Sequence, residues 1–188
     1  MTYLIRHYSQ RVGKILLWIS LFSTPLQSAH GAKFSEDQVK AVYLINFAEF
    51  IRWPDNAFSE HPKQFHFCAL QIETPVISML KKVIVNESSR GRKFIFRQIN
   101  NQEELKYCQI IYFHNSDQSR FIDSLPLLEK NSILTVSDDK AFIKNGGMIA
   151  IIRSHKRLRP TINVKRLEKT GLKASAKLLE LANIVENN

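Results

Sequence analysis

The spacing of apolar and polar positions changes several times along the chain. Residues 38–53 are apolar at helical spacing, and residues 92–99 alternate as a half-exposed strand does. Almost continuous apolar runs of strand length cover residues 65–72, 109–115, 132–137 and 148–154. Shorter segments with helical spacing lie between them, at residues 77–84, 101–108, 119–130 and 139–147. Strands that alternate with short helices predict βαβ units and a mainly parallel sheet.

The last part of the chain predicts a different connection. Residues 157–164 have strand character and follow the preceding strand after the polar turn "SHK", which indicates an antiparallel hairpin. Pro160 would place this strand at an edge of the sheet, because proline cannot donate a ladder hydrogen bond. A helical segment over residues 165–186 closes the chain, with Gly171 as a point where it can break. The prediction is therefore a single α/β domain, with a mainly parallel sheet flanked by helices, a C-terminal β-hairpin and a closing helix.

The first helix has a well-defined start and an unusual surface. Ser35 and Gln38 have the spacing of a capping box, and Pro54 predicts an end near Arg52. One broad apolar arc of this helix holds three aromatic residues that we interpret as core: Tyr43, Phe47 and Phe50. Three further apolar residues fall outside the arc: Val42, Ile45 and Trp53. These either lie beneath the loop after Pro54 or face a second protein, and they are the candidate partner interface.

The N-terminal residues have the layout of a secretory signal peptide. A basic region precedes the apolar run "ILLWISLF" and small residues surround Gly31, so we expect cleavage near Gly31. The expected organisation is a signal peptide over residues 1–31 and one domain over residues 32–188. An uncleaved anchor is the alternative. Since no later segment reaches the length of a membrane-spanning helix, we expect an exported protein without a transmembrane segment.

The remaining residues are basic. Without residues 1–31 the chain has 24 Lys and Arg against 17 Asp and Glu, a net charge of +7. The densest run of charge is "RSHKRLRPTINVKR", residues 153–166. It is either a solvated hairpin rim or a contact with an acidic partner or anionic lipid head groups. Nucleic-acid binding is not favoured, because few aromatic residues interleave with these charges.

The two cysteines, Cys68 and Cys108, lie after the predicted cleavage site. In an oxidising compartment an even pair favours a disulfide, and two buried free thiols are the alternative.

Known catalytic and cofactor motifs are missing from the sequence. It contains no G-x-G-x-x-G, P-loop, H-E-x-x-H, C-x-x-C or G-x-S-x-G pattern, and its histidines are dispersed. Asp138 and Asp139 follow a strand, but they also suit the N-terminus of the next helix. Gly146 and Gly147 suit the end of one element and the start of another. We therefore expect no catalytic, metal or cofactor site.

Several motifs together resemble the YfiR-like family of periplasmic regulatory proteins. The stretch "VKAVYLINFAEFIRWP" is similar to the opening helix of that family. Further similarities follow in order: "FCAL", "GRKFIFRQI", "CQIIYF", "ILTVSD", "FIKNGGMIAI", "LRPTINV" and "GLKASAKLLELA". The resemblance covers residues 38 to 182. It implies a compact α/β domain in the periplasm, without enzymatic activity and with no cofactor.

The resemblance also implies partners. Members of this family repress an inner-membrane diguanylate cyclase by binding its periplasmic sensor domain, and an outer-membrane lipoprotein can sequester them. Cys68 and Cys108 match a cysteine pair that forms a disulfide in the family, whereas a second pair found in some members is missing here. Reduction of the bridge could release the cyclase, and a homodimer is a further hypothesis.

The alternative function is a periplasmic small-ligand receptor that feeds another membrane signalling protein. Parallel sheets offer a crevice at the carboxyl ends of their strands, which here lies near Gln71, Asn115 and Ser137–Asp138.

Overall fold

A computed structural model of the chain describes residues 34–70, 73–154 and 157–186. The predicted signal peptide and its cleavage near Gly31 lie outside the described residues. Across the part that is described, no helix combines the length and the apolar character needed to cross a membrane.

Helix α2 (Glu36–Phe50) begins as the sequence predicts and ends earlier. Ser35 accepts a hydrogen bond from the Gln38 main-chain N–H, and the Gln38 side chain accepts one from the Ser35 N–H, which completes the capping box. The predicted end near Arg52 is wrong by two residues. Ile51–Arg52 form strand β1, which pairs antiparallel with β9 (Lys173–Ala174), so a long-range pairing replaces the last helical turn.

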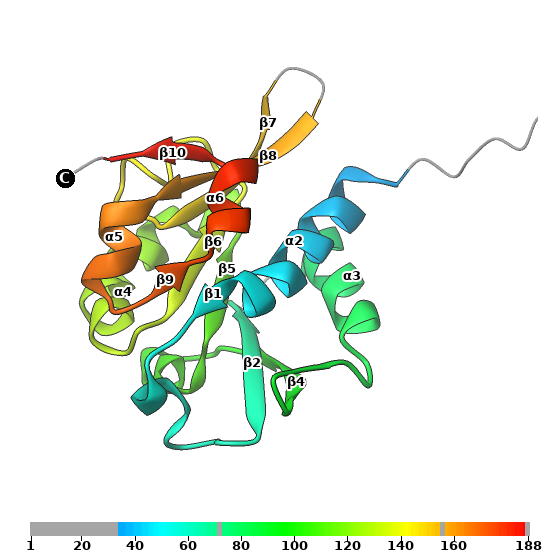
Figure 1. Cartoon of the computed structure of the whole chain (residues 1–188), viewed down its shortest axis with the longest axis vertical. Helices are drawn as coiled ribbons and strands as arrows, with labels where there is room; N and C mark the ends of the chain where they lie inside the picture. Colours follow the sequence, from blue (N-terminus) through cyan, green and yellow to red (C-terminus); the bar gives the residue numbers. More distant parts are fainter. Residues whose placement is uncertain (1–33, 71–72, 155–156, 187–188) are drawn as a thin grey trace, which may run out of the picture. The chain divides into compact units, whose positions relative to one another are not determined.

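The eight strands of the main sheet are ordered β10-β8-β7-β6-β5-β2-β4-β3 (Figure 1). Their bounds are β2 Gln64–Ala69, β3 Ser88–Ser89, β4 Arg92–Gln98, β5 Ile110–Phe113, β6 Leu134–Ser137, β7 Ile149–Ser154, β8 Arg157–Asn163 and β10 Asn183–Val185. Strands β4, β2, β5, β6 and β7 are parallel to one another, and the β7–β8 and β3–β4 pairs are antiparallel. The α/β class, the mainly parallel sheet and the hairpin are confirmed.

Two hydrophobic cores lie on opposite faces of this sheet, because successive side chains of a strand point to opposite sides. We call them the α2 face and the α4 face. On the α2 face, helices α2 and α3 (Pro75–Val83) cover alternate strand residues such as Phe65 and Phe67. On the α4 face, helix α4 (Gln118–Lys130) and the 3₁₀ segment η2 (Gln102–Tyr107) cover Cys68 and Phe113.

The hairpin strand β8 is not an edge strand along its whole length. Its residues Thr161–Asn163 pair in parallel with β10, which forms the actual edge. Pro160 pairs with Ile151 of β7 and lies one residue before the β10 pairing. The proline is therefore placed where its missing N–H interrupts no pairing with β10.

Two predicted helices differ from the structure. Residues 140–146 form turns, in which the Asp139 carboxylate accepts from the Ala141 N–H and Gly147 N–H donates to Phe142 O. The closing segment consists of α5 (Val164–Lys169), β9, α6 (Ala176–Leu181) and β10 rather than one helix. The break at Gly171 is observed, with a φ of +79° that favours glycine. The short strands arise because β1 and β8 offer unpaired main-chain groups to this segment.

Candidate functional site around Trp53

The aromatic residues of α2 lie in or against the core of the α2 face. Phe47 is fully buried, whereas Tyr43 and Phe50 are half-buried and pack at its border. The Tyr43 hydroxyl also donates to the Leu158 main-chain oxygen at 3.2 Å. All three side chains thus stabilise the attachment of α2 to the sheet.

The three candidate interface residues are placed differently from one another. Val42 is 46% exposed on the outer surface of α2, and Ile45 is half-buried against the core. Trp53 is half-buried, and its ring meets the Phe65 ring edge-on at a centroid distance of 5.0 Å. The Trp53 indole N–H donates to the main-chain oxygen of Gln109 at 3.3 Å. Of these residues, Val42 is the one whose side chain is open to solvent, and Trp53 is fixed beside the loop after Pro54.

Gln109 anchors that loop and had no signal in the sequence. Its side chain is buried, donates to Ala57 O at 2.7 Å and accepts from the His66 main-chain N–H at 2.7 Å. Together with the indole hydrogen bond, these contacts hold the 3₁₀ segment η1 (Asp55–Phe58) against β2 and β5. Trp53 therefore has a defined orientation.

A pocket of about 150 Å³ lies beside Trp53. Its walls come from the end of α2, from η1, from β2 and from the β3–β4 turn, and its residues are Ala48, Trp53, Asp55, Phe58, Phe65, Ser89, Arg90 and Arg92. The turn residues Arg90 and Gly91 both have positive φ, the geometry of a two-residue hairpin turn. The sequence "SRGR" carries this signal, although its position beside Trp53 depends on the fold.

The two arginines of the pocket have different surroundings. The Arg90 guanidinium donates to the main-chain oxygens of Glu49 at 2.5 Å and Ile51 at 3.4 Å. These oxygens lie at the C-terminus of α2, where the helix dipole favours a positive charge. The Arg92 guanidinium carbon lies 3.8 Å from the centroid of the Phe58 ring. Its Nε and the Ser89 Oγ are buried without a hydrogen-bond partner in the protein. Arg92 and Ser89 therefore have hydrogen-bonding capacity that the fold leaves unused.

Charges at the carboxyl ends of the strands are paired within the chain. Lys40 Nζ lies 3.0 Å from Asp138 Oδ2 and 3.3 Å from Glu36 Oε1, and Arg153 Nη2 lies 2.5 Å from Glu36. Burial alone would lower the pKa of Lys40, but the hydrogen bonds and charges of Asp138 and Glu36 outweigh it and raise that pKa. The hydrogen bond from Arg153 lowers the pKa of Glu36, and Lys40 adds to this effect.

The crevice expected for a ligand receptor is occupied in part by this network. The Asp138 carboxylate is held by Lys40, and the Ser137 hydroxyl accepts from the Asp139 N–H at 3.1 Å. Asn115 is exposed in the 3₁₀ segment η3 (Asn115–Asp117), and Gln71 lies outside the described residues. Asp139 stabilises a turn rather than a helix start.

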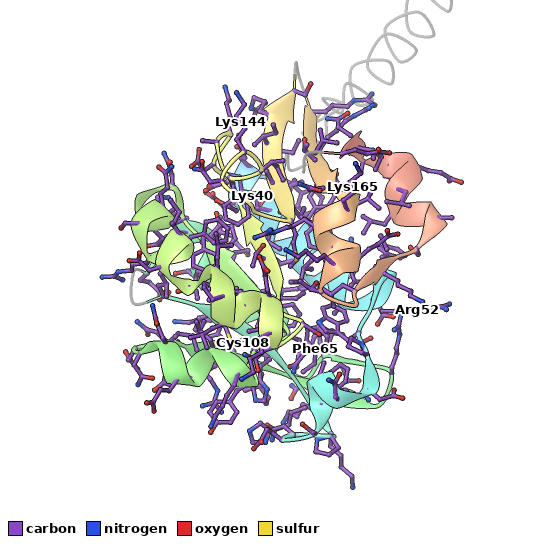
Figure 2. All side chains as sticks on the ribbon, turned by 90° about the vertical axis from the view of Figure 1, so that its left-hand side faces the viewer. Lys40, Arg52, Phe65, Cys108, Lys144 and Lys165 are labelled. Carbon is purple, nitrogen blue, oxygen red and sulfur yellow. A yellow bond between two sulfur atoms is a disulfide. The ribbon has the colours of Figure 1, made fainter. Side chains whose placement is uncertain are left out.

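The disulfide predicted between Cys68 and Cys108 is present, with Cα atoms 5.9 Å apart, and the alternative of two free thiols is wrong. On the α4 face it joins β2 to Cys108, the C-cap residue of η2, which lies two residues before β5. Figure 2 shows Cys108 and Phe65 toward one end of the molecule and Lys40 toward the other.

Two glycines and one histidine complete the α4 face. Gly146 has a φ of +92°, and a Cβ on Gly147 would collide with the Phe142 ring. His66 is 1% exposed, and its ring lies 5.0 Å from that of His61. Burial, with the charges of Arg97 and His61, lowers the pKa of His66 to about 4. Among the described residues, no group of three or more His, Cys, Asp and Glu could hold a metal ion.

Comparisons with known structures agree with the fold. A conserved domain protein from Vibrio cholerae O1 biovar El Tor has a TM-score of 0.51 and 11% identity, and the match covers 81% of this chain. The ABC domain in complex with L-Trp from Streptococcus pneumonia has a TM-score of 0.50 and 11% identity, and the match covers 79% of this chain. The match spans 60% of the length of each of those chains. Such low identity shows the α/β fold alone.

The sequence comparisons are more specific. No curated protein matches the chain. A family model described as YfiR/HmsC-like matches residues 37–183, from the first turn of α2 to the first residue of β10. Because the match covers well over half of the 188 residues and includes both faces of the sheet, the chain belongs to the YfiR/HmsC-like family.

Proposed function

We propose that this protein is a periplasmic repressor of a membrane-bound diguanylate cyclase, and that it acts by binding the cyclase's periplasmic sensor domain. The observation that carries this proposal is the family match over residues 37–183. The family is one of periplasmic regulators of cyclic-di-GMP signalling. Membership supports a regulatory rather than a catalytic role and an interaction with a membrane signalling partner.

Repression would follow from a population shift in the cyclase. A repressor that binds the inactive arrangement of the sensor domain more tightly than the active one increases the inactive fraction. The size of the shift depends only on the difference between the two affinities. No covalent step and no cofactor of the repressor are required.

The proposed contact surface is the outer side of α2 around Val42, continuing toward Trp53. Val42 is a large apolar side chain on the outer side of a helix whose opposite side, with Phe47 and Ala48, faces the core. Tryptophan is frequent among residues that dominate binding energy at interfaces, which supports a contribution of Trp53. An outer-membrane lipoprotein that competes for this surface, and a homodimer, are further proposals.

The test is affinity capture from detergent-solubilised envelopes, with the protein tagged at its C-terminus and produced from the full chain. We expect recovery of an inner-membrane protein with a diguanylate cyclase output domain, and lower cyclase activity when purified repressor is added. Val42→Asp should reduce capture about tenfold or more, because it places a charge in an apolar contact. Ile122→Asp is the matched control, since Ile122 is 47% exposed on α4.

The outcomes separate the function from the surface. Recovery of a cyclase that loses binding with Val42→Asp and keeps it with Ile122→Asp supports both proposals. An equal loss of cyclase capture by the two variants would reject the α2 contact surface but not the proposed repressor function. If no cyclase is recovered and no cyclase responds to the protein, the proposed function is wrong.

A further inference from the structure

We propose that the pocket beside Trp53 is a binding site for a small monocarboxylate that carries a flat apolar group. The proposal goes beyond repression of a cyclase, because it assigns a ligand class to this protein itself. Direct binding to the purified protein tests it, so the identity of any partner does not affect the result.

The polar wall of the pocket comes from one cross-strand pair. Ser89 of β3 lies directly opposite Arg92 of β4, so both side chains are on the same side of the hairpin. Ser89 is 5% exposed, and both its Oγ and the Arg92 Nε are buried without a protein partner. Buried polar groups of native proteins are normally hydrogen-bonded, so these two donors indicate an acceptor that comes from outside the chain.

The geometry of Arg92 suits a carboxylate in particular. Its guanidinium carbon lies 3.8 Å from the centroid of the Phe58 ring, and this cation–π contact restricts the position of the group. A planar guanidinium can donate two parallel hydrogen bonds to a carboxylate, and such charge-assisted bonds are stronger than neutral ones. The Ser89 hydroxyl supplies a further donor in the same pocket.

The apolar part of the ligand would contact the aromatic wall. Trp53 and Phe65 meet edge-on at 5.0 Å, and Phe58 lies next to Phe65 at a centroid distance of 6.2 Å. Because Phe65 is buried, the half-buried rings of Trp53 and Phe58 form the apolar part of a pocket whose lining is otherwise mainly polar. A flat group is favoured because aromatic rings and the Arg92 guanidinium bound the available space.

The remaining charges limit the charge of the ligand. Arg90 adds positive potential, although its guanidinium is engaged by the carbonyl groups at the end of α2. Asp55 is exposed and lines the same pocket, so its carboxylate disfavours ligands with two negative charges. A monocarboxylate therefore fits better than phosphate or a dicarboxylate.

The experiment uses benzoate as the probe, with benzamide and inorganic phosphate as controls. Trp53 is the only tryptophan after residue 31, so its fluorescence reports on this pocket once Trp18 has been replaced by Phe. We expect a saturable fluorescence change and heat of binding with benzoate, and neither with benzamide or phosphate. Phenylacetate should bind similarly, because it has the same two chemical parts.

Two variants and a matched control locate the site. Arg92→Lys keeps the charge but lacks the planar pair of donors, and should weaken benzoate binding about tenfold or more. Ser89→Ala should weaken it by a smaller factor. Arg97→Lys is the control, because Arg97 lies on the same strand, stacks over Tyr107 at 5.0 Å and also has a buried Nε without a partner, but it does not line this pocket.

The results decide the proposal and the source of the carboxylate. No saturable binding of benzoate or phenylacetate, or equal weakening by Arg92→Lys and Arg97→Lys, would overturn it. A carboxylate could arrive as a free small molecule or as the acidic side chain of a partner. Tighter binding of benzoate than of an amidated peptide with one glutamate between two phenylalanines assigns a free ligand, and the reverse order assigns a partner side chain.

Discussion

Both faces of the sheet have aromatic residues in their cores, but the two cores are packed differently. On the α4 face, the rings of Phe113, Phe121 and Phe142 lie 4.4–6.1 Å apart, Gly147 packs directly on one of them, and a disulfide ties β2 to the end of η2. On the α2 face, the core is similarly buried beneath α2 and α3, yet it opens beside Trp53 into a pocket.

With binding at the α2 face as proposed, this difference separates the part of the domain that provides stability from the part that binds. The α4 face has a covalent link and tight ring packing, which suit it to hold the strands in place. The α2 face carries an exposed valine on its helix and two buried donors without a protein partner in its pocket. Substitutions on the α4 face should therefore change stability, and those around the Trp53 pocket should change binding.

The largest expected effect on stability comes from removing the disulfide of the α4 face. Replacing both cysteines, with Cys68→Ser and Cys108→Ser together, should lower the free energy of unfolding by about 4 kcal/mol, because the bridge closes a loop with a sequence separation of 40. Urea unfolding under oxidising conditions measures this change. A reductant should lower the stability of the wild-type protein by a similar amount and leave the variant unaffected.

The same variant tests whether the bridge is regulatory. If reduction of the disulfide releases the cyclase, the double variant should repress less than the wild-type protein at equal concentration. An unchanged repression curve would leave the disulfide with a structural role alone.

A smaller loss of stability is expected when the ion pair between Lys40 of α2 and Asp138 is broken. Lys40→Met leaves the mostly buried Asp138 carboxylate without its cation, and should cost about 3 kcal/mol of stability. Adding Asp138→Asn should restore much of the loss. Lys81→Met is the control, because its 2.8 Å ion pair with Glu73 is exposed and should contribute at most about 0.5 kcal/mol. Equal losses for the two lysine variants would contradict this ranking.

The third effect depends on pH and concerns the α4 face. The pKa of His66 is about 4 in the folded protein and 6.5 in the unfolded chain, so the unfolded chain binds the proton first as pH falls. Stability should decrease between pH 6.5 and pH 4, by about 2–3 kcal/mol in total. Chemical unfolding at several pH values measures the slope, which should be shallower over this range in His66→Asn.

Other groups also titrate at low pH, so the comparison between proteins decides this prediction. The pKa values of Glu36 and Glu73 are lowered in the folded protein, and their contributions to stability are lost as pH falls below 4.5 in both proteins. An identical pH dependence of wild type and His66→Asn between pH 6.5 and 4.5 would show that His66 does not contribute.

Local patterns in the sequence were sufficient for several parts of the fold. The capping box of Ser35 and Gln38 joins residues three positions apart, and the β7–β8 hairpin joins neighbouring segments. The sequence also predicts the disulfide, because two cysteines after a predicted export signal allow only one intramolecular pair. These features depend on residues that are close in sequence or, for the disulfide, on the number of cysteines in the chain.

The candidate site was predicted only in part. Trp53 stood out because it lies outside the apolar arc of α2, but Arg92, Ser89 and Gln109 carried no functional signal. Their importance follows from pairings between segments about 40 to 60 residues apart, which place the β3–β4 turn and the start of β5 next to the end of α2.

By itself, the sequence determined the α/β class, the start of the first helix and the positions of most strands, because periodicity and capping act over a few residues. Tertiary structure decided the rest. It converted the closing helix into two short helices and two strands, since β1 and β8 offered ladder partners, and it paired Lys40 with Asp138 across 98 residues. Long-range hydrogen bonds and ion pairs outweigh local helix propensities of less than about 1 kcal/mol per residue.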